Sequence, residues 1–320
     1  MIIKSIEKGV DFLVSNQNEN GSYPETVYFL KEGVWKKNYP SLFSSSLISN
    51  SVSEILKKRD LMSDEIISKS EQLQKKSFEF FVSEMKMPGI WKFGASCDEM
   101  WRNLPFDLDD TCTISFLLKD HHPYIHFGMN RNIIIKNRNE AGLFYTWILP
   151  PALAEKNDID SIVNVNTILY LGENPATSKA LDYICKLINE DREEGSSYYY
   201  LNRFFLYYFI SRAYSNGCLG FEKCKDSIIN KLLTAGAELN NVLLKAISIT
   251  SLVNFGFCKQ DILASKTEEI FNGMNSDGSW EKIPFYQGGE YPKPISLYYG
   301  SESITTTVCL EGLVKYLSVL

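Results

Sequence analysis

The 320-residue sequence lacks basic runs and long apolar stretches. Lys and Arg number 33 against 39 Asp and Glu, which gives a formal net charge of −6. Proteins bind nucleic acid through clustered Lys and Arg, so a nucleic-acid partner is not expected. The densest apolar stretch, residues 204–210, is far shorter than the ~18 residues that span a bilayer. We therefore expect no transmembrane segment, while contact with a membrane surface stays open.

Paired cysteines and a secretion signal are also missing. The seven cysteines are odd in number, scattered, and never spaced as CxxC. Disulfide frameworks and many zinc sites use such pairs, so we expect reduced thiols in a cytoplasmic protein. The N-terminal stretch MIIKSIEKGVDFLVSNQ carries charges throughout and no cleavage site of small residues, which argues against a signal peptide.

Helical periodicity dominates the sequence. Ile2, Ile6, Val10 and Leu13 recur at three- and four-residue spacings, on one face of a helix. Loops rich in Gly, Asn, Ser and Pro separate the other periodic stretches. Those stretches are 44–58, 65–86, 110–119, 160–171, 176–188, 201–215, 224–235, 240–255, 259–273 and 302–318. The sequence therefore predicts an all-α protein.

Residues 124–149 are the exception to this periodicity. Two runs rich in β-forming residues flank the turn residues Asn137, Arg138 and Asn139. This pattern predicts a small β-hairpin inserted into the helical scaffold. No change of composition marks a linker, so we expect residues 1–320 to form one domain.

Three segments share a pattern of a basic residue, an aromatic or aliphatic pair, a polar stretch, and then Gly-x-Trp or Gly-x-Tyr. They are 8–23, 76–91 and 266–280, and 179–198 is a weaker fourth copy. We expect each to be a helix end, a glycine that reverses the chain, and an aromatic side chain packed between neighbouring helices. Such units bury their apolar faces only by stacking. Three chance glycine–aromatic turns are the alternative.

The stretch PFDLDDTCTIS (105–115) contains Asp107, Asp109 and Asp110. One Asp at the start of a helix is a common N-cap, favoured by the helix dipole. Three in four positions exceed that need, and like charges packed together raise the pKa of at least one carboxyl when buried. A carboxyl that keeps its proton near neutral pH can act as a general acid. A capping or ion-binding cluster is the alternative.

The pattern Asp-x-Asp-Asp-Thr resembles the signature of class II terpene cyclases, and the three repeats resemble the QW repeats of squalene–hopene cyclases. The repeats match imperfectly: the first keeps Gln17 but has Tyr23 for Trp, and the others have Met85 and Asn275 for Gln. The resemblance implies an (α/α)6 barrel of six inner and six outer helices over nearly the whole chain.

The resemblance also implies roles for individual residues. The middle Asp of the motif protonates a terminal alkene or epoxide, which assigns this role to Asp109, with Asp107 and Asp110 as supporting carboxylates. Alkene protonation needs a dry pocket, and aromatic faces can stabilise the resulting cation. Candidate substrate-binding residues are Trp101, Phe106, Tyr198, Tyr199, Tyr200, Phe204, Tyr207, Tyr208, Phe285, Tyr298, Tyr299 and Glu302. Ordinary packing is the alternative for each aromatic residue. Glu302 could contact the substrate, assist deprotonation or cap its helix, and the cap is favoured.

The implied activity is a protonation-initiated cyclase for a linear polyprenyl chain, either a C15–C20 diphosphate or a prenylated small molecule. It requires no cofactor. With a diphosphate substrate Mg²⁺ is a possible but not a required cofactor, and Lys36, Lys37 and Arg102 are candidate contacts. A dimer or a partner protein is an alternative means of closing the site. The sequence is also compatible with two other classes of protein. One is a non-terpenoid enzyme on the same barrel, and the other is a non-catalytic module that binds an isoprenoid or a peptide.

The sequence lacks the metal-binding motifs of the related metal-dependent enzyme families. Class I terpene synthases bind magnesium through Asp-Asp-x-x-Asp, but Thr-Cys-Thr follows Asp110, and Val165 stands where their second motif needs Glu. Protein prenyltransferases bind zinc through Asp, Cys and a downstream His. All three histidines here lie within 121–126, so that set is absent. For the histidines, a loop is favoured over a metal site.

Overall fold

The computed structural model describes residues 2–99, 103–122, 125, 127–289 and 294–320, and only the backbone of 37–39. Within these residues the chain forms mainly helices. The α-helices are α1 (Ile2–Asn16), α2 (Leu42–Leu56), α3 (Asp64–Glu84), α4 (Leu108–Leu118), α5 (Phe127–Lys136), α6 (Ser161–Leu171), α7 (Ser178–Asn189), α8 (Arg203–Ser215), α9 (Glu222–Thr234), α10 (Val242–Asn254), α11 (Gln260–Asn272) and α12 (Glu302–Leu317). Short 3₁₀ turns lie at Arg59–Leu61, Pro151–Lys156, Leu219–Phe221 and Gly236–Glu238. Every helix predicted from periodicity is confirmed.

The even-numbered helices pack in a closed ring. α2 contacts α4, the contacts continue through α6, α8 and α10 to α12, and α12 contacts α2 again. These helices are buried almost all round, as α6 is over its whole length. The helices outside the ring bury one face only. In α7 that face consists of Ala180, Leu181, Ile184, Cys185, Leu187 and Ile188. This contrast is the one expected between inner and outer helices.

The predicted β-hairpin at 124–149 is wrong. Residues 127–136 form α5, in which Asn130 and Ile134 share the buried face. Of the three consecutive isoleucines that favoured a strand, only Ile134 is buried on this face. Residues 137–149 form no hairpin strands, and Asn137 instead donates hydrogen bonds to the carbonyl oxygens of Tyr145 (3.0 Å) and Trp147 (3.1 Å).

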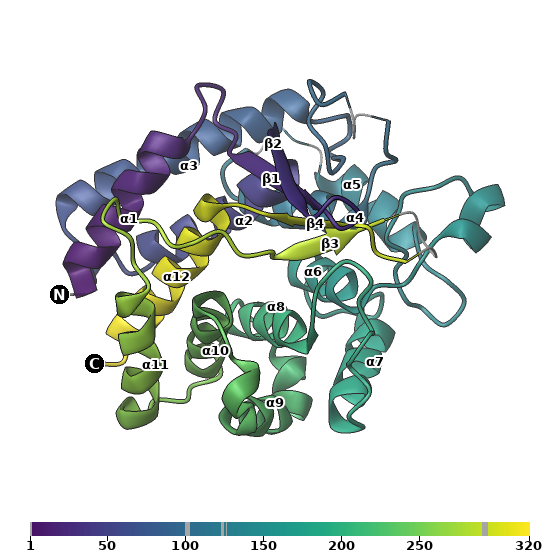
Figure 1. Ribbon diagram of the computed structural model, residues 1–320. Helices are drawn as coiled ribbons and strands as arrows, with labels where there is room; N and C mark the ends of the chain where they lie inside the picture. Colours follow the sequence, from purple (N-terminus) through teal and green to yellow (C-terminus); the bar gives the residue numbers. More distant parts are fainter. Residues whose placement is uncertain (1, 100–102, 123–124, 126, 290–293) are drawn as a thin grey trace.

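A small antiparallel sheet forms elsewhere and was not predicted. Its strands are β1 (Pro24–Phe29), β2 (Val34–Pro40), β3 (Tyr286–Gly288) and β4 (Leu297–Gly300), in the order β2-β1-β4-β3. The β1–β4 pair joins the two ends of the chain, with Thr26 opposite Gly300. β4 leads directly into α12, and Tyr286 of β3 lies 3.4 Å from the hydroxyl of Ser41, the N-cap of α2. The sheet therefore lies beside the N-terminal ends of ring helices (Figure 1).

The repeated segments tie one helix to the next. In two copies the indole Nε1 donates back to a carbonyl oxygen of the preceding helix, from Trp91 to Phe81 and from Trp280 to Ile270, both at 2.7 Å. The backbone N–H of each aromatic residue donates to a hydroxyl within the first five residues of the following ring helix. These pairs are Tyr23 with Ser45 (3.0 Å), Trp91 with Thr111 (3.1 Å) and Trp280 with Thr306 (3.1 Å).

The weaker copy at 179–198 departs from this arrangement, because the N–H of Tyr198 donates instead to the side chain of Asp160 (2.8 Å). The second copy holds the start of α4, where the acidic motif lies, through the hydrogen bond between Trp91 and Thr111.

Among the described residues no helix has the length and apolar character to cross a bilayer.

Candidate active site

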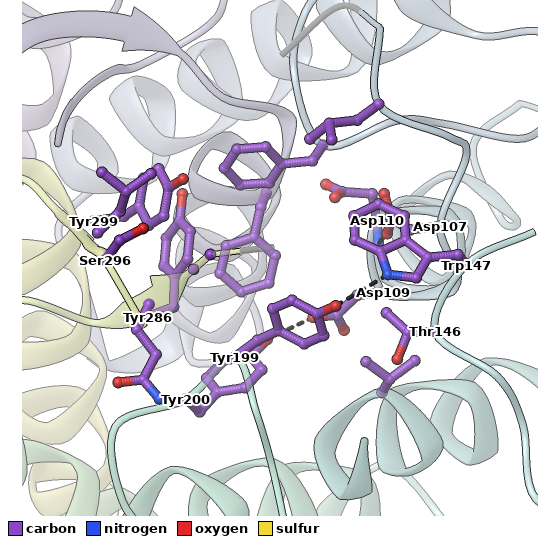
Figure 2. Close-up of a pocket in the computed structure, with 18 residues that line it drawn as sticks. Asp107, Asp109, Asp110, Thr146, Trp147, Tyr199, Tyr200, Tyr286, Ser296 and Tyr299 are labelled. Atoms are coloured by element: carbon purple, nitrogen blue, oxygen red, sulfur yellow. Dashed lines mark hydrogen bonds between the residues drawn. The ribbon is translucent and has the colours of Figure 1, made fainter. Parts of the chain in front are cut away.

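A cavity of about 340 Å³ lies between the sheet and the N-terminal ends of α2, α4 and α6. Figure 2 shows its wall. The described residues that line it are Phe43, Phe93, Leu104, Asp107, Asp109, Asp110, Thr146, Trp147, Val163, Tyr199, Tyr200, Tyr286, Gln287, Gly288, Gly289, Ser296, Leu297 and Tyr299. All three aspartates of the predicted motif therefore line one hollow.

Aromatic rings make up much of this wall. Tyr286 stacks on Tyr299 with centroids 4.8 Å apart and 7° between the planes, and Phe43 meets Tyr286 edge-on at 4.8 Å. On another part of the wall the indole of Trp147 donates to the hydroxyl of Tyr199 at 3.0 Å. The π faces of such rings attract a cation without reacting with it as a nucleophilic water would.

Asp107 starts α4. Its backbone is extended (φ −130°, ψ 162°), and Oδ1 accepts from the N–H of Asp110 at 2.8 Å, as an N-cap does. The capping interpretation is thus correct for this residue. Burial, with the charge of Asp109 as a smaller cause, raises the pKa of Asp107 to about 8.

Asp109 is held by two neutral donors. The hydroxyl of Tyr200 donates to Oδ2 and the amide of Asn166 donates to Oδ1, both at 2.6 Å. Burial raises the pKa of Asp109 to about 6, and the two hydrogen bonds oppose that rise because they stabilise the ionised form. Asp109 can therefore hold a proton near neutral pH, and its conjugate base is already solvated by the protein.

Of the three aspartates, Asp110 lies in the environment that most strongly disfavours the ionised form. It is 2% exposed, and burial followed by the charges of Asp107 and Asp109 raises its pKa well above the ordinary value. Among the described residues, neither Asp107 Oδ2 nor Asp110 Oδ1 has a hydrogen-bond partner. Asp107 and Asp110 therefore favour their protonated forms, and Asp109 is the carboxyl of the three that the site prepares for ionisation.

Asp160 places Tyr200 against Asp109. As the N-cap of α6, its Oδ1 accepts from the N–H groups of Ile162 (2.8 Å) and Val163 (3.2 Å). Its Oδ2 accepts from the hydroxyl of Ser197 (2.6 Å) and from two N–H groups of the tyrosine run 198–200. One buried carboxylate thus anchors the loop that carries two cavity-lining tyrosines.

The structure brings together only some of the residues predicted to bind substrate. Tyr199, Tyr200 and Tyr299 line the cavity with the three aspartates. Trp101 lies outside the described residues. The other predicted residues are absent from the described wall, namely Phe106, Tyr198, Phe204, Tyr207, Tyr208, Phe285, Tyr298 and Glu302.

Several of these side chains make contacts away from the described wall. Tyr208 is buried and donates to Glu311 at 2.7 Å. Phe204 is buried edge-on against Tyr207 at 5.9 Å. Phe106 lies under the ammonium of Lys92, 5.2 Å from the ring centroid.

Tyr198 and Glu302 also stand beside the site rather than in its wall. Tyr198 packs edge-on against Tyr199 at 5.0 Å. Glu302 is exposed in the first turn of α12, where Lys282 approaches its carboxylate at 3.9 Å. The cap of that helix is Ser301, so Glu302 is not the cap either.

Sequence reasoning missed Phe43, Phe93, Trp147 and Tyr286 as wall residues. Only tertiary contacts bring these positions together, and none carries a local signal. Asn166 had a signal, because it is a polar residue inside the apolar stretch that forms α6. In the structure its side-chain amide donates a hydrogen bond to Asp109.

The described wall contains no Lys, Arg or His. Of the cations considered for a diphosphate, Lys36 pairs with Glu32, while Arg102 and the side chain of Lys37 lie outside the described residues. In the part of the chain that the structure describes, no three His, Cys, Asp or Glu side chains are grouped as a metal site.

No protein-family model and no curated protein sequence matches the chain. Solved structures do match it. A protein from Actinoplanes aligns with a TM-score of 0.70 at 12% identity, over 99% of this chain and 100% of that one. A possible member of the GH105 family from Salmonella enterica aligns with a TM-score of 0.61 at 11% identity, over 99% and 93%.

A third match is the type II terpene cyclase MstE from Scytonema, solved in complex with its substrate geranylgeranyl dihydroxybenzoate. It aligns with a TM-score of 0.71 at 12% identity, over 100% of this chain and 98% of that one. The chain therefore has a predominantly helical fold similar to that of a type II terpene cyclase over its whole length.

Proposed function

We propose that this chain is a class II terpene cyclase, a single (α/α)6 barrel over residues 1–320 in which Asp109 is the general acid. One observation carries this function above all. Asp109 lies in the wall of an aromatic cavity, with its conjugate base stabilised by Tyr200 and Asn166. The ring of inner helices and the fold shared with a type II terpene cyclase support the same function.

The chemistry follows from these contacts. The π electrons of a terminal C=C bond take the proton of Asp109, which leaves a carboxylate on the enzyme and a carbocation on the substrate. The hydroxyl of Tyr200 and the amide of Asn166 stabilise the new carboxylate without rearranging. A second C=C bond of the folded chain attacks the cation and closes a ring. Aromatic faces stabilise the positive charge as it moves.

A prenylated neutral or aromatic small molecule fits this cavity better than a prenyl diphosphate. The described wall contains no Lys, Arg or His that would neutralise the charge of a buried diphosphate. Its volume of about 340 Å³ falls near the lower end of the roughly 300–1,000 Å³ of small-molecule sites. The substrate bound to MstE, a prenylated dihydroxybenzoate, is of this class. We propose that no magnesium is required.

The test is to incubate the purified protein with farnesyl and geranylgeranyl hydroxybenzoates, and separately with the two prenyl diphosphates, and to analyse products by mass spectrometry. We expect an isomer of a prenyl arene, with unchanged mass and shifted retention. Asp109→Asn should lower the rate by about 100-fold or more, since general acid catalysis contributes about 10²–10⁴.

The matched control is Asp120→Asn, an exposed carboxylate just beyond the other end of α4. It should keep wild-type activity, and circular dichroism should show both variants folded. An Asp109→Asn variant that retains full activity would overturn the acid assignment. Turnover of polar substrates alone would favour a non-terpenoid enzyme, and binding of prenyl arenes without turnover would favour a binding module.

A further inference from the structure

A further buried carboxyl, outside the acidic motif, lies directly behind the aromatic wall. Glu25 of β1 is 2% exposed, and its Oε1 accepts hydrogen bonds from the hydroxyls of Tyr286 and Ser44. Tyr286 lines the cavity, whereas Glu25 is absent from the described wall. Tyr286 therefore connects the cavity wall to a carboxyl that does not line the cavity.

The position of the Tyr286 phenol is fixed on several sides. Its ring is stacked on Tyr299 and met edge-on by Phe43, and its hydroxyl lies 3.4 Å from the hydroxyls of Ser41 and Ser44. In Figure 2 the Tyr286–Tyr299 pair and the aspartates lie on opposite sides of the cavity. A substrate that fills the hollow would meet the acid at one wall and this phenol at the other.

Glu25 is suited to exchange a proton near neutral pH. Burial raises its pKa to about 7, and the hydrogen bonds from Ser44 and Tyr286 oppose that rise. The other titratable groups that act on it electrostatically are Asp98, Asp110 and Tyr299. All of these are acids, so the environment favours uptake of a proton by Glu25.

A buried tyrosine–glutamate pair can also be purely structural, and the chain contains such a pair. Glu311 Oε2 accepts from Tyr208 and Ser51, both at 2.7 Å, in the same combination of donors. None of the three is among the described residues of the cavity wall. The feature that distinguishes Glu25 is therefore the opening of its tyrosine onto the cavity, and the second pair supplies a matched control.

We propose that Tyr286 and Glu25 form the proton acceptor that ends the cyclisation. This role rests on the proposed cyclase function. A C–H bond next to the final carbocation breaks, and its electron pair forms the C=C bond of the product. The Tyr286 oxygen takes the released proton while the phenol proton passes to Glu25 Oε1. The substrate cation is thus neutralised, Tyr286 is unchanged, and Glu25 becomes a neutral acid.

The net result of one turnover is a proton moved from Asp109 to Glu25. Both groups return to their starting forms by exchange with water once the product leaves. Tyr286 is the catalytic residue of this step because it touches the substrate. Glu25 acts through Tyr286 and is a positioning and proton-storing residue.

The test compares Tyr286→Phe and Glu25→Gln with Tyr208→Phe, using a prenyl arene that wild type turns over in an Asp109-dependent way. Tyr286→Phe keeps the stacked ring and removes only the hydroxyl. We expect substrate consumption in both site variants, with the major alkene falling at least about fivefold as a share of product. Alkene isomers and water-quenched alcohols should replace it. Tyr208→Phe should leave the product ratio unchanged.

Glu25 needs a readout that a structural role would not move. In wild type the alkene share should rise as pH increases through about 7, because the ionised form accepts the proton, whereas Glu25→Gln should give a flat profile. Unchanged product ratios in the folded site variants would overturn this inference and leave the cyclase function intact. A wild-type protein that turns over no prenyl substrate would overturn the cyclase function itself.

Discussion

The hydroxyl of Tyr200 should set the pH at which the enzyme works. Proton donation needs protonated Asp109, so the rate should be highest below the pKa of about 6 and fall as pH rises through it. Tyr200→Phe removes one of the two donors that stabilise the ionised form. The ring itself should stay in place, since it packs on Phe43, Phe209 and Phe285 at 6.0, 5.3 and 6.3 Å.

The size of the effect follows from the hydrogen bond that is lost. A hydrogen bond to a charged group contributes about 1.5–3 kcal/mol, and one pKa unit corresponds to about 1.4 kcal/mol. The pKa of Asp109 should therefore rise by about 1 to 2 in Tyr200→Phe. A weaker acid also protonates an alkene more slowly, so the maximal rate should fall by about 3- to 10-fold.

The assay is the rate of cyclised product from a prenyl arene between pH 5 and about pH 9, for wild type and variant. The control is Tyr207→Phe, which removes a phenol that donates to Glu193 at 2.5 Å and is absent from the described cavity wall. Its profile should match that of wild type. A folded Tyr200→Phe variant whose pH profile does not move would refute the assignment of Asp109 as the acid that Tyr200 tunes.

Three other changes have defined outcomes. Asp107→Asn keeps the helix cap but removes a carboxyl whose pKa is about 8 when folded. Ionisation of this carboxyl destabilises the folded wild type as pH rises from about 4 to 8, so in urea unfolding the variant should be more stable than wild type by about 1–3 kcal/mol at pH 8 and by little at pH 4. A variant with the same free energy of unfolding as wild type at both pH values would contradict this. Gly21→Ala should lower Tm by at least about 4 °C, because φ is +87° and a Cβ would lie 2.0 Å from the carbonyl oxygen of Lys76. Gly217→Ala has φ +101° but open space, and should cost less. Chelation with EDTA should leave turnover of a prenyl arene unchanged, and a loss restored by Mg²⁺ would contradict the magnesium-free proposal.

The sequence predicted those features that depend on local pattern. The spacing of apolar residues predicted the helices, and the density of Asp107, Asp109 and Asp110 predicted an electrostatic cluster beyond a cap. Helix and strand compete in short β-branched runs, which is why the isoleucines of 133–135 misled the interpretation of α5.

The rest depends on contacts between distant parts of the chain. The strands β1 and β4 pair across the whole sequence, with Thr26 opposite Gly300, and are too short to leave a clear alternating pattern. The partners of Asp109 come from α6 and from the loop before α8. The same holds for Tyr286 and Glu25, which meet only because β1 and β3 flank β4.

Cyclisation of a prenyl arene in D₂O tests the central claim most directly. If Asp109, equilibrated with solvent, starts the reaction, the product gains one deuterium on the carbon that takes the proton, and its mass rises by about 1 Da relative to the product in H₂O. Asp109→Asn should yield no labelled product. A cyclised product without deuterium would contradict initiation by a protein carboxyl.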